Sequence, residues 1–327
     1  MKITILSTRN CGKKHVSYTT ILGLEDEFIE NGCFILKCKP FSYFMNRIFR
    51  NINVNLNMKT INKSMLDECE GYFFYSAMVL EDILDMRATL KQVNERLILY
   101  VFDCWEPKWM EFQAILKEIN PKAICFAYDK AVKHFSQWFE NCWLMPQSMN
   151  LKYYHEYNLS KRRLFMQMGR KTECIHEMII NYLVKNKVPI NDLNYVYEKQ
   201  KGTVIFPDTA TLAKEIASSY FFVCVPQNIE NSKLTGNISE VTARYYEAMA
   251  CKTMIIGIKP TDSFDKLFPY SNAMCEVNGE TFEKTVTYYL ENEDEYNIIT
   301  ARNYDYVMKN HRWKNRLKDL EKRLQSV

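Results

Sequence analysis

Three charged residues in the last third of the chain have the types and spacing of a phosphate and ribose site. Glu240, Arg244 and Glu247 stand at i, i+4 and i+7, so a helix with 3.6 residues per turn would place them on one face. An arginine can clamp a diphosphate, and a carboxylate can accept hydrogen bonds from a ribose diol. A helix N-terminus attracts phosphate, and Gly236 before it would allow close backbone approach. The pattern predicts a nucleotide-sugar site.

Two purely structural interpretations of the same residues remain open at this point. The three charges could form a solvated salt-bridge stripe, in which each pair contributes a few tenths of a kcal/mol. Asn237 followed by Glu240 could be a helix-capping pair. The spacing alone does not choose between these interpretations and a ligand site.

The segment Thr-Ala-Arg-Tyr-Tyr-Glu-Ala-Met-Ala-Cys at 242–251 resembles the donor-binding segment of GT-B glycosyltransferases. The similarity is to those with a "glycosyl transferases group 1" C-terminal domain, which include spore-maturation-protein-like enzymes. This resemblance implies that Glu247 binds the donor ribose and that Arg244 lies near the diphosphate. The sequence departs from the family at Lys252, where glycine is frequent. It also departs at Glu240, because many members carry two glutamates eight positions apart rather than seven.

Other short stretches resemble the same family in the same order along the chain. They are Trp-Leu-Met-Pro-Gln-Ser-Met-Asn at 143–150 with Tyr-Tyr-His at 153–155, Phe-Met-Gln-Met-Gly-Arg at 165–170, and Asn-His-Arg-Trp-Lys-Asn-Arg at 310–316. They are similar to the interdomain segment, the first strand and phosphate-facing loop of the second domain, and the terminal helix. Residues 1–140 match the family only in broad pattern.

Cationic groups are the expected partners of the donor diphosphate, because the sequence contains no Asp-x-Asp metal motif. Arg170, Lys171 and Arg244 are the predicted phosphate clamps, and Gly169 would permit close backbone approach. No metal site and no cofactor are predicted, since the nucleotide sugar is a substrate. The competing interpretation of Arg170 is a surface arginine at a helix start.

A general base for the acceptor hydroxyl would come from the first half of the chain. His15, in the loop after the first strand, and Asp103, at the end of a later strand, are the candidates. An exposed loop histidine and a helix cap are the respective structural alternatives. The aromatic, basic segment 41–49 could line an acceptor site or pack in the core.

Alternating strand and helix patterns predict how these residues are positioned. The expected fold is α/β, with two Rossmann-like, doubly wound parallel-sheet domains facing across a cleft, as in GT-B enzymes. The predicted divisions are an acceptor domain at 1–148, a donor domain at 149–305, and a terminal helix at 306–327 that packs back on the first domain. Strands are expected at 2–7, 33–37, 71–74, 96–102, 123–127, 142–145, 164–168, 203–206, 221–225 and 254–258.

Composition limits the compartment and the partners. The 11 cysteines lack a Cys-x-x-Cys pair, which indicates a reducing compartment. A net charge of +4 argues against nucleic acid as a partner. No run approaches the roughly 18 apolar residues of a membrane span, so a cytoplasmic protein is expected. Peripheral membrane contact stays open through the basic run 309–323.

The sequence thus predicts a metal-independent glycosyltransferase of polysaccharide biosynthesis. It would move a sugar from a nucleotide-sugar donor to a glycan, lipid-linked or protein acceptor. A nucleotide-sugar epimerase of the same fold and a degenerate, non-catalytic scaffold subunit are the alternatives.

Overall fold

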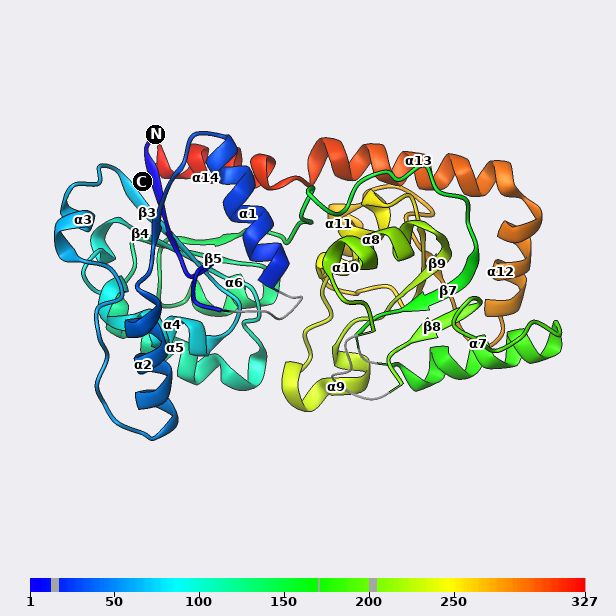
Figure 1. Ribbon diagram of the computed structural model, residues 1–327, viewed down its shortest axis with the longest axis horizontal. Coiled ribbons are helices and arrows are strands. Elements are labelled where there is room, and N and C mark those ends of the chain that lie inside the picture. The colour runs from blue at the N-terminus through cyan, green and yellow to red at the C-terminus, as the bar shows by residue number, and fades with distance from the viewer. Residues whose placement is uncertain (13–17, 170, 200–204, 327) are drawn as a thin grey trace. The chain divides into compact units, whose positions relative to one another are not determined.

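The computed structural model describes residues 1–12, 18–169, 171–199 and 205–326 (Figure 1). The chain divides into two compact units. Unit 1 contains residues 1–147, 233–238 and 313–327, and unit 2 contains residues 148–232 and 239–312. The chain therefore passes between the units several times. His15 and Arg170 lie outside the described residues.

Unit 1 is built on a six-stranded parallel sheet with strand order β2-β1-β3-β4-β5-β6. Its strands are β1 (Ile3–Ser7), β2 (Phe34–Lys37), β3 (Tyr72–Ala77), β4 (Leu97–Val101), β5 (Ala123–Phe126) and β6 (Cys142–Leu144). Its helices are α1 (Tyr18–Glu30), α2 (Pro40–Asn51), α3 (Lys63–Asp67), α4 (Leu80–Leu90), α5 (Trp109–Ile119), α6 (Asp129–Phe135) and α14 (Trp313–Leu324), with short 3-10 turns η1 (Asn94–Arg96) and η2 (Glu106–Lys108).

The apolar strands of unit 1 explain where its core sits. Every residue of β4 is buried, as expected for a central parallel strand covered on both faces. The terminal helix α14 adds Trp313, whose ring makes edge contacts with Tyr100 and Phe102 at centroid distances of 6.2 and 6.0 Å. The Trp313 backbone N–H donates to the buried carboxylate of Glu27 in α1. The end of the chain is thus an integral part of the first core.

Unit 2 is built on a five-stranded parallel sheet with strand order β11-β10-β9-β7-β8. Its strands are β7 (Arg163–Gln167), β8 (Tyr195–Tyr197), β9 (Ser219–Cys224), β10 (Met254–Gly257) and β11 (Cys275–Glu276). Its helices are α7 (Glu173–Lys185), α8 (Thr209–Ala217), α10 (Ala243–Ala250), α11 (Phe264–Leu267), α12 (Phe282–Glu291) and α13 (Glu293–Asn310), and α9 (Asn228–Thr235) spans the boundary with unit 1.

Each sheet has one place where the strand order reverses. In unit 1 the chain leaves β1 for β2 on one side and returns to β3 on the other. In unit 2 it leaves β7 for β8 and returns to β9. In open parallel sheets, ligands bind beyond the carboxyl ends of the strands at such a point. The loops after β1, β3, β7 and β9 are therefore the places where a site is expected.

Several elements differ from the sequence predictions. The segment 40–68, for which no element was predicted, forms α2 and α3. The expected strand at 203–206 is absent from its described part, where Ile205 and Phe206 are not in a strand. The second strand of unit 2 in chain order is instead β8, at Tyr195–Tyr197, and β9 is the third. The first unit boundary falls between Gln147 and Ser148, and α13 keeps residues up to Arg312 in unit 2.

No helix in the described part of the chain is long and apolar enough to cross a membrane.

Candidate functional site

The Arg244–Glu247 pair forms the charged centre of the predicted donor site. The two residues lie in α10, and Arg244 Nη1 is 2.7 Å from Glu247 Oε2. The Glu247 side chain is only 4% exposed, whereas that of Arg244 is 28% exposed. Because α10 follows β9, its first turn begins at the carboxyl edge of the sheet. The pair therefore places a cation at the edge where ligands of parallel sheets bind.

The electrostatics of this pair depend on its buried neighbours. Burial disfavours the charged Arg244 guanidinium, but its interactions with the Glu247 carboxylate and with Tyr154 outweigh this effect, so its pKa is raised. Tyr154 is fully buried, and burial raises the pKa of its phenol, with the Glu247 charge adding to the effect. Burial also raises the pKa of Cys251. Arg244 stays a cation and these neighbours stay neutral near pH 7.

Tyr154 is a site residue that the sequence analysis did not single out as functional. It lies in the stretch that resembles the interdomain segment of the family, and this resemblance was the only feature of the sequence that could have pointed to Tyr154. Its position 90 residues before Arg244 in the chain gave no indication that the two side chains interact.

Glu240 does not share a helix face with the pair, which corrects the predicted i, i+4, i+7 arrangement. The helix begins at Ala243, so Glu240 lies in the loop before it and Asn237 cannot form a capping box with it. Glu240 is 3% exposed and accepts a 2.9 Å hydrogen bond from Ser263 Oγ. It is a buried group beside α11, within the same unit as Arg244 and Glu247.

The loop after β7 has the backbone form expected of a phosphate-facing turn. Gly169, two residues after the end of β7, has φ +89, a left-handed conformation, and a Cβ added there would meet nothing within 4 Å. Lys171 Nζ forms a 3.0 Å ion pair with Glu173 at the start of α7. Arg170, between them, lies outside the described residues.

Gly236 has the predicted close backbone approach, but to a side chain of unit 1. Its φ is +66, and a Cβ built on it would lie 2.3 Å from Glu106 Oε2. The next backbone N–H, that of Asn237, donates to the same carboxylate at 2.7 Å, and Lys130 Nζ contacts the Asn237 carbonyl. The glycine thus accommodates Glu106, and residues 233–238 belong to unit 1.

The candidate base in unit 1 has a clear position. Asp103 follows β4 and accepts a 3.1 Å hydrogen bond from Tyr128 Oη. The same phenol oxygen accepts a 3.3 Å hydrogen bond from the Gln147 side-chain amide. It does not cap a helix, since the nearest turn, η2, has Trp105 as its N-cap. His15, the other candidate, lies outside the described residues.

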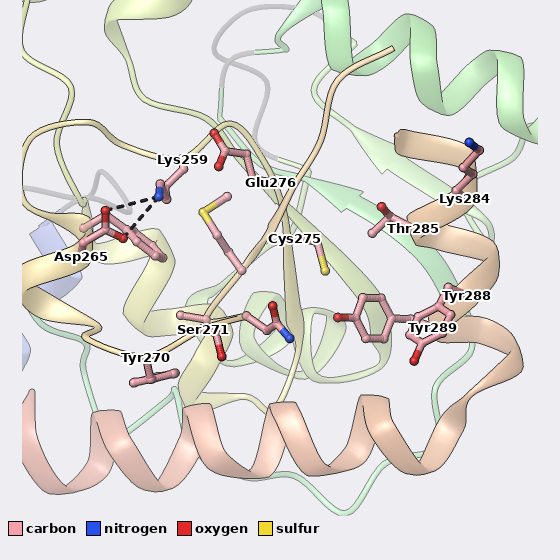
Figure 2. Close-up of a pocket in the computed structure, with 14 residues that line it drawn as sticks. Lys259, Asp265, Tyr270, Ser271, Cys275, Glu276, Lys284, Thr285, Tyr288 and Tyr289 are labelled. Atoms are coloured by element: carbon pink, nitrogen blue, oxygen red, sulfur yellow. Dashed lines mark hydrogen bonds and ion pairs between the residues drawn. The ribbon is translucent and has the colours of Figure 1, made fainter. Parts of the chain in front are cut away.

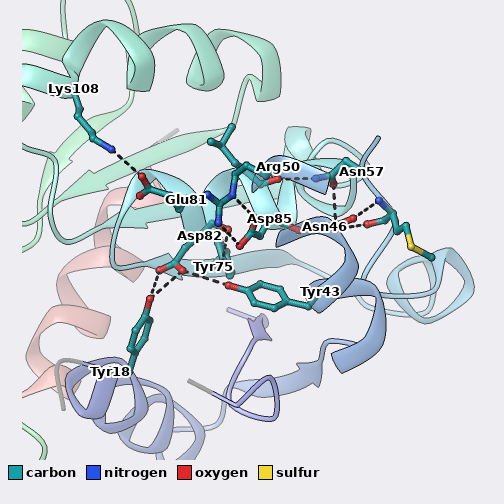
Figure 3. A network of polar contacts seen from close by, with 12 residues as sticks. Tyr18, Tyr43, Asn46, Arg50, Asn57, Tyr75, Glu81, Asp82, Asp85 and Lys108 are labelled. Atoms are coloured by element: carbon teal, nitrogen blue, oxygen red, sulfur yellow. Dashed lines mark hydrogen bonds and ion pairs between the residues drawn. The ribbon is translucent and has the colours of Figure 1, made fainter. Parts of the chain in front are cut away.

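A second acidic group at the same edge was missed by the sequence analysis. Asp82, in the first turn of α4, accepts hydrogen bonds from the Met78 backbone N–H at 2.9 Å and from the phenols of Tyr18 and Tyr43 at 3.2 and 3.4 Å (Figure 3). Burial and the Asp82 charge raise the pKa of both phenols. This network lies where the strand order of unit 1 reverses. Its members are 64 and 39 residues from Asp82 in sequence, so no local pattern indicated it.

A pocket of about 610 Å³ lies elsewhere in unit 2, beside the edge strand β11. Loop residues 270–274 and the α12 side chains of Lys284, Tyr288 and Tyr289 line it, together with the Lys259–Asp265 ion pair (Figure 2). None of the predicted site residues lines this pocket. The charged pair of α10 and the left-handed Gly169 after β7 lie outside this pocket.

Among the described residues, no group of three or more His, Cys, Asp or Glu side chains is placed to hold a metal ion.

Comparison with known proteins links this geometry to a family. Residues 197–322, which include α10 and most of unit 2, match the sequence family described as "Glycosyl transferase-like". No curated protein sequence matches the chain.

Solved structures match over both units. An α-glucosyltransferase in complex with UDP and a 13-mer DNA containing a HMU base is 11% identical, with a TM-score of 0.59 and 99% of each chain covered. The apo structure of OtsA is 8% identical, with a TM-score of 0.53 and 98% of each chain covered. A TarM mutant of S. aureus in complex with fondaparinux, α-GlcNAc-glycerol and UDP is 9% identical, with a TM-score of 0.50, covering 77% of this chain and 55% of that one.

At these identities the structural likeness shows the fold, and the family match shows the type of domain. Together, these findings show that the chain has the two-domain fold of GT-B glycosyltransferases and that residues 197–322 form a glycosyl transferase-like domain.

Proposed function

We propose that this enzyme transfers a sugar from a nucleotide-sugar donor, without a metal ion, to a glycan, lipid-linked or protein acceptor. The observation that carries the proposal is the Arg244–Glu247 pair, which lies within the matched family segment and at the carboxyl edge of the unit 2 sheet. Structural neighbours that hold UDP support a uridine nucleotide as the first donor to test.

Five of the seven predicted donor-site residues have a defined role in this proposal. Arg244 would bind the diphosphate, since its guanidinium has five N–H donors and its raised pKa keeps it charged. Glu247 would accept hydrogen bonds from the ribose diol. Gly169 would let the backbone approach a phosphate, with Lys171 and Arg170 adding positive charge. These cations would stabilise the negative charge that develops on the departing diphosphate.

The acceptor hydroxyl would lose its proton to a carboxylate of unit 1. Asp103 is the predicted candidate and follows β4 at the carboxyl edge of that sheet. His15 is the second candidate. An Asp103→Asn variant that loses turnover while retaining UDP affinity would assign the role to Asp103.

Isothermal titration calorimetry with UDP, GDP, CDP, ADP and TDP, with and without magnesium, tests the donor site. We expect one nucleotide to bind without metal, and Glu247→Gln to weaken it at least tenfold, which corresponds to about 1.4 kcal/mol. Glu283→Gln is the matched control, because Glu283 is another ion-paired glutamate of unit 2, at 2.7 Å from Lys185. Unchanged affinity in a folded Glu247→Gln protein would refute the site assignment.

Product analysis with the preferred nucleotide sugar tests the reaction. A transferase forms its product only when an acceptor is present. An epimerised sugar formed without any acceptor would show that the enzyme is an epimerase instead. Binding of no nucleotide at millimolar concentration would favour a non-catalytic scaffold.

A further inference from the structure

Helix α2 (Pro40–Asn51) presents its polar side chains to the protein interior. Tyr43 donates a 3.4 Å hydrogen bond to Asp82, and Asn46 Nδ2 donates at 2.8 Å to the Asp85 carbonyl. Arg50 Nε is 2.8 Å from Asp85 Oδ1 (Figure 3). Tyr43 and Asn46 are 3% and 1% exposed. The inner face of this helix is therefore a hydrogen-bonded polar face.

The apolar side chains of the same helix point the other way. Phe41, Phe44 and Ile48 stand at i, i+3 and i+7, which is one helix face. Phe41 is 69% exposed and Phe44 is 59% exposed. A helix of a globular protein ordinarily turns its apolar stripe toward the core, so this helix is reversed. Contiguous exposed apolar residues of this kind mark an interaction surface.

The chain continues this apolar surface after the helix ends. Ile52, Val54 and Leu56 are 61%, 44% and 54% exposed and alternate with asparagines. We define the α2 surface by its apolar members, which are Phe41, Phe44, Ile48, Ile52, Val54 and Leu56. All of them come from one stretch of 16 residues.

The sequence segment that carries the α2 surface is basic. Residues 31–66 contain six basic residues and no acidic one, although the whole chain carries a net charge of only +4. Arg50 is engaged inward with Asp85, and the other five are exposed. These five are Lys37, Lys39, Arg47, Lys59 and Lys63.

We propose that the α2 surface binds an anionic lipid membrane. A helix with an aromatic and aliphatic outer face among basic residues is the arrangement that lies in the headgroup region of a bilayer. The apolar side chains would enter the acyl boundary, and the lysines and Arg47 would meet lipid phosphates. Nucleic acid would use the basic and aromatic residues, but it offers no partner for exposed Ile52, Val54 and Leu56. The inference does not depend on the proposed donor site, which lies in unit 2.

Co-sedimentation of the full chain with vesicles tests this inference. We expect binding to vesicles of equal parts phosphatidylglycerol and phosphatidylcholine, and at least tenfold weaker binding to phosphatidylcholine alone. Phe41→Ser/Phe44→Ser should weaken binding to the anionic vesicles at least tenfold. Val184→Ser/Leu193→Ser is the matched control, because these residues of unit 2 are 62% and 65% exposed and should leave binding unchanged.

A charge series provides a second, independent readout. Replacing Lys37 and Lys39 with glutamine should weaken vesicle binding by about fivefold for each residue, the effect expected of about 1 kcal/mol per basic residue near an anionic surface. Both sets of variants must retain the far-ultraviolet circular dichroism of the parent chain. Since Phe41 and Phe44 are exposed, their replacement removes no core contact.

Three outcomes would overturn the inference. They are equal binding to neutral and anionic vesicles, unchanged vesicle binding by the folded Phe41→Ser/Phe44→Ser variant, and tighter binding to a DNA duplex than to anionic vesicles. The duplex is included because one structural neighbour is bound to DNA.

Discussion

At the scale of single residues, the proposed donor site rests on a 2.7 Å ion pair in which the glutamate is almost fully buried. Glu247 is nearly fully buried while Arg244 reaches the surface. Removing one partner of a buried pair leaves an uncompensated charge, which costs more than the pair contributes. Both Glu247→Gln and Glu247→Ala leave Arg244 without its charge partner, but glutamine keeps the size of the side chain and replaces one acceptor oxygen with an amide donor, so it tests the acceptor role without opening a cavity.

Lys161 offers a residue-scale test of electrostatics away from the site. Its ammonium donates to the carbonyls of Ala217 and Lys252 at 2.9 and 3.0 Å, and burial lowers its pKa to about 7. The unfolded value is near 10.4, so between pH 7 and 10 the unfolded chain binds a proton that the folded chain does not. The stability contribution of this group must therefore rise with pH across that window.

We expect Lys161→Met to remove this pH dependence. The difference in unfolding free energy between the parent and the variant should change by up to about 1.4 kcal/mol per pH unit between pH 7 and 9, in favour of the parent at higher pH. Urea unfolding of both proteins at several pH values measures this difference in unfolding free energy. A difference that stays flat with pH would show that Lys161 remains charged in the folded protein.

At the scale of elements, the end of α10 shows how a non-glycine residue occupies a glycine position. Lys252 follows the C-cap residue Cys251 with φ +51, the left-handed conformation that glycine usually takes after a helix. Its ammonium pairs with Glu156 and lies 5.1 Å from the Tyr304 ring centroid. The departure from the family at this position therefore preserves the turn and leaves the helix geometry intact.

Two substitutions separate the backbone strain from the side-chain contacts of Lys252. Both Lys252→Gly and Lys252→Ala remove the Glu156 contact, but only glycine adopts the left-handed conformation without strain. We expect the glycine variant to be more stable than the alanine variant by about 1 kcal/mol, measured by thermal or urea unfolding. Equal stability would mean that this turn relaxes when its side chain is lost.

At the scale of the whole molecule, the two proposed partners would bind to different units. The nucleotide would bind at the carboxyl edge of the unit 2 sheet, and the lipid surface would contact α2 in unit 1. Each partner should therefore protect a different set of backbone amides.

Hydrogen–deuterium exchange can map both partners in one protein. We expect UDP to slow exchange at Gly169 and in the first turn of α10, without changing α2. Anionic vesicles should protect residues 41–56 and leave α10 unaffected. Protection of the pocket beside β11 by UDP, instead of α10, would move the donor site to that pocket.

Much of the fold could be predicted because its signals are local. Buried apolar runs predicted β1, β4, β5, β7 and β10 within a residue or two. The Arg244–Glu247 contact was also accessible, because residues three apart in a helix meet whatever the rest of the chain does. The prediction that Glu240 shares this helix face was wrong, because the helix begins three residues after it.

By itself, the sequence determined the alternating strands and helices, the parallel architecture and the segment that carries the charges of the proposed donor site. These follow from patterns within a few residues. Only the tertiary structure decided that Gly236 accommodates Glu106, that Tyr154 adjoins Arg244, and that α2 turns its polar side chains inward. Those features depend on partners that are distant in sequence, and the packing of the whole unit brings them together. The reversal of α2 in particular could not be predicted. An apolar helix stripe normally faces the core, and only the structure shows that the buried carboxylates of Asp82 and Asp85 contact the polar face of α2 instead.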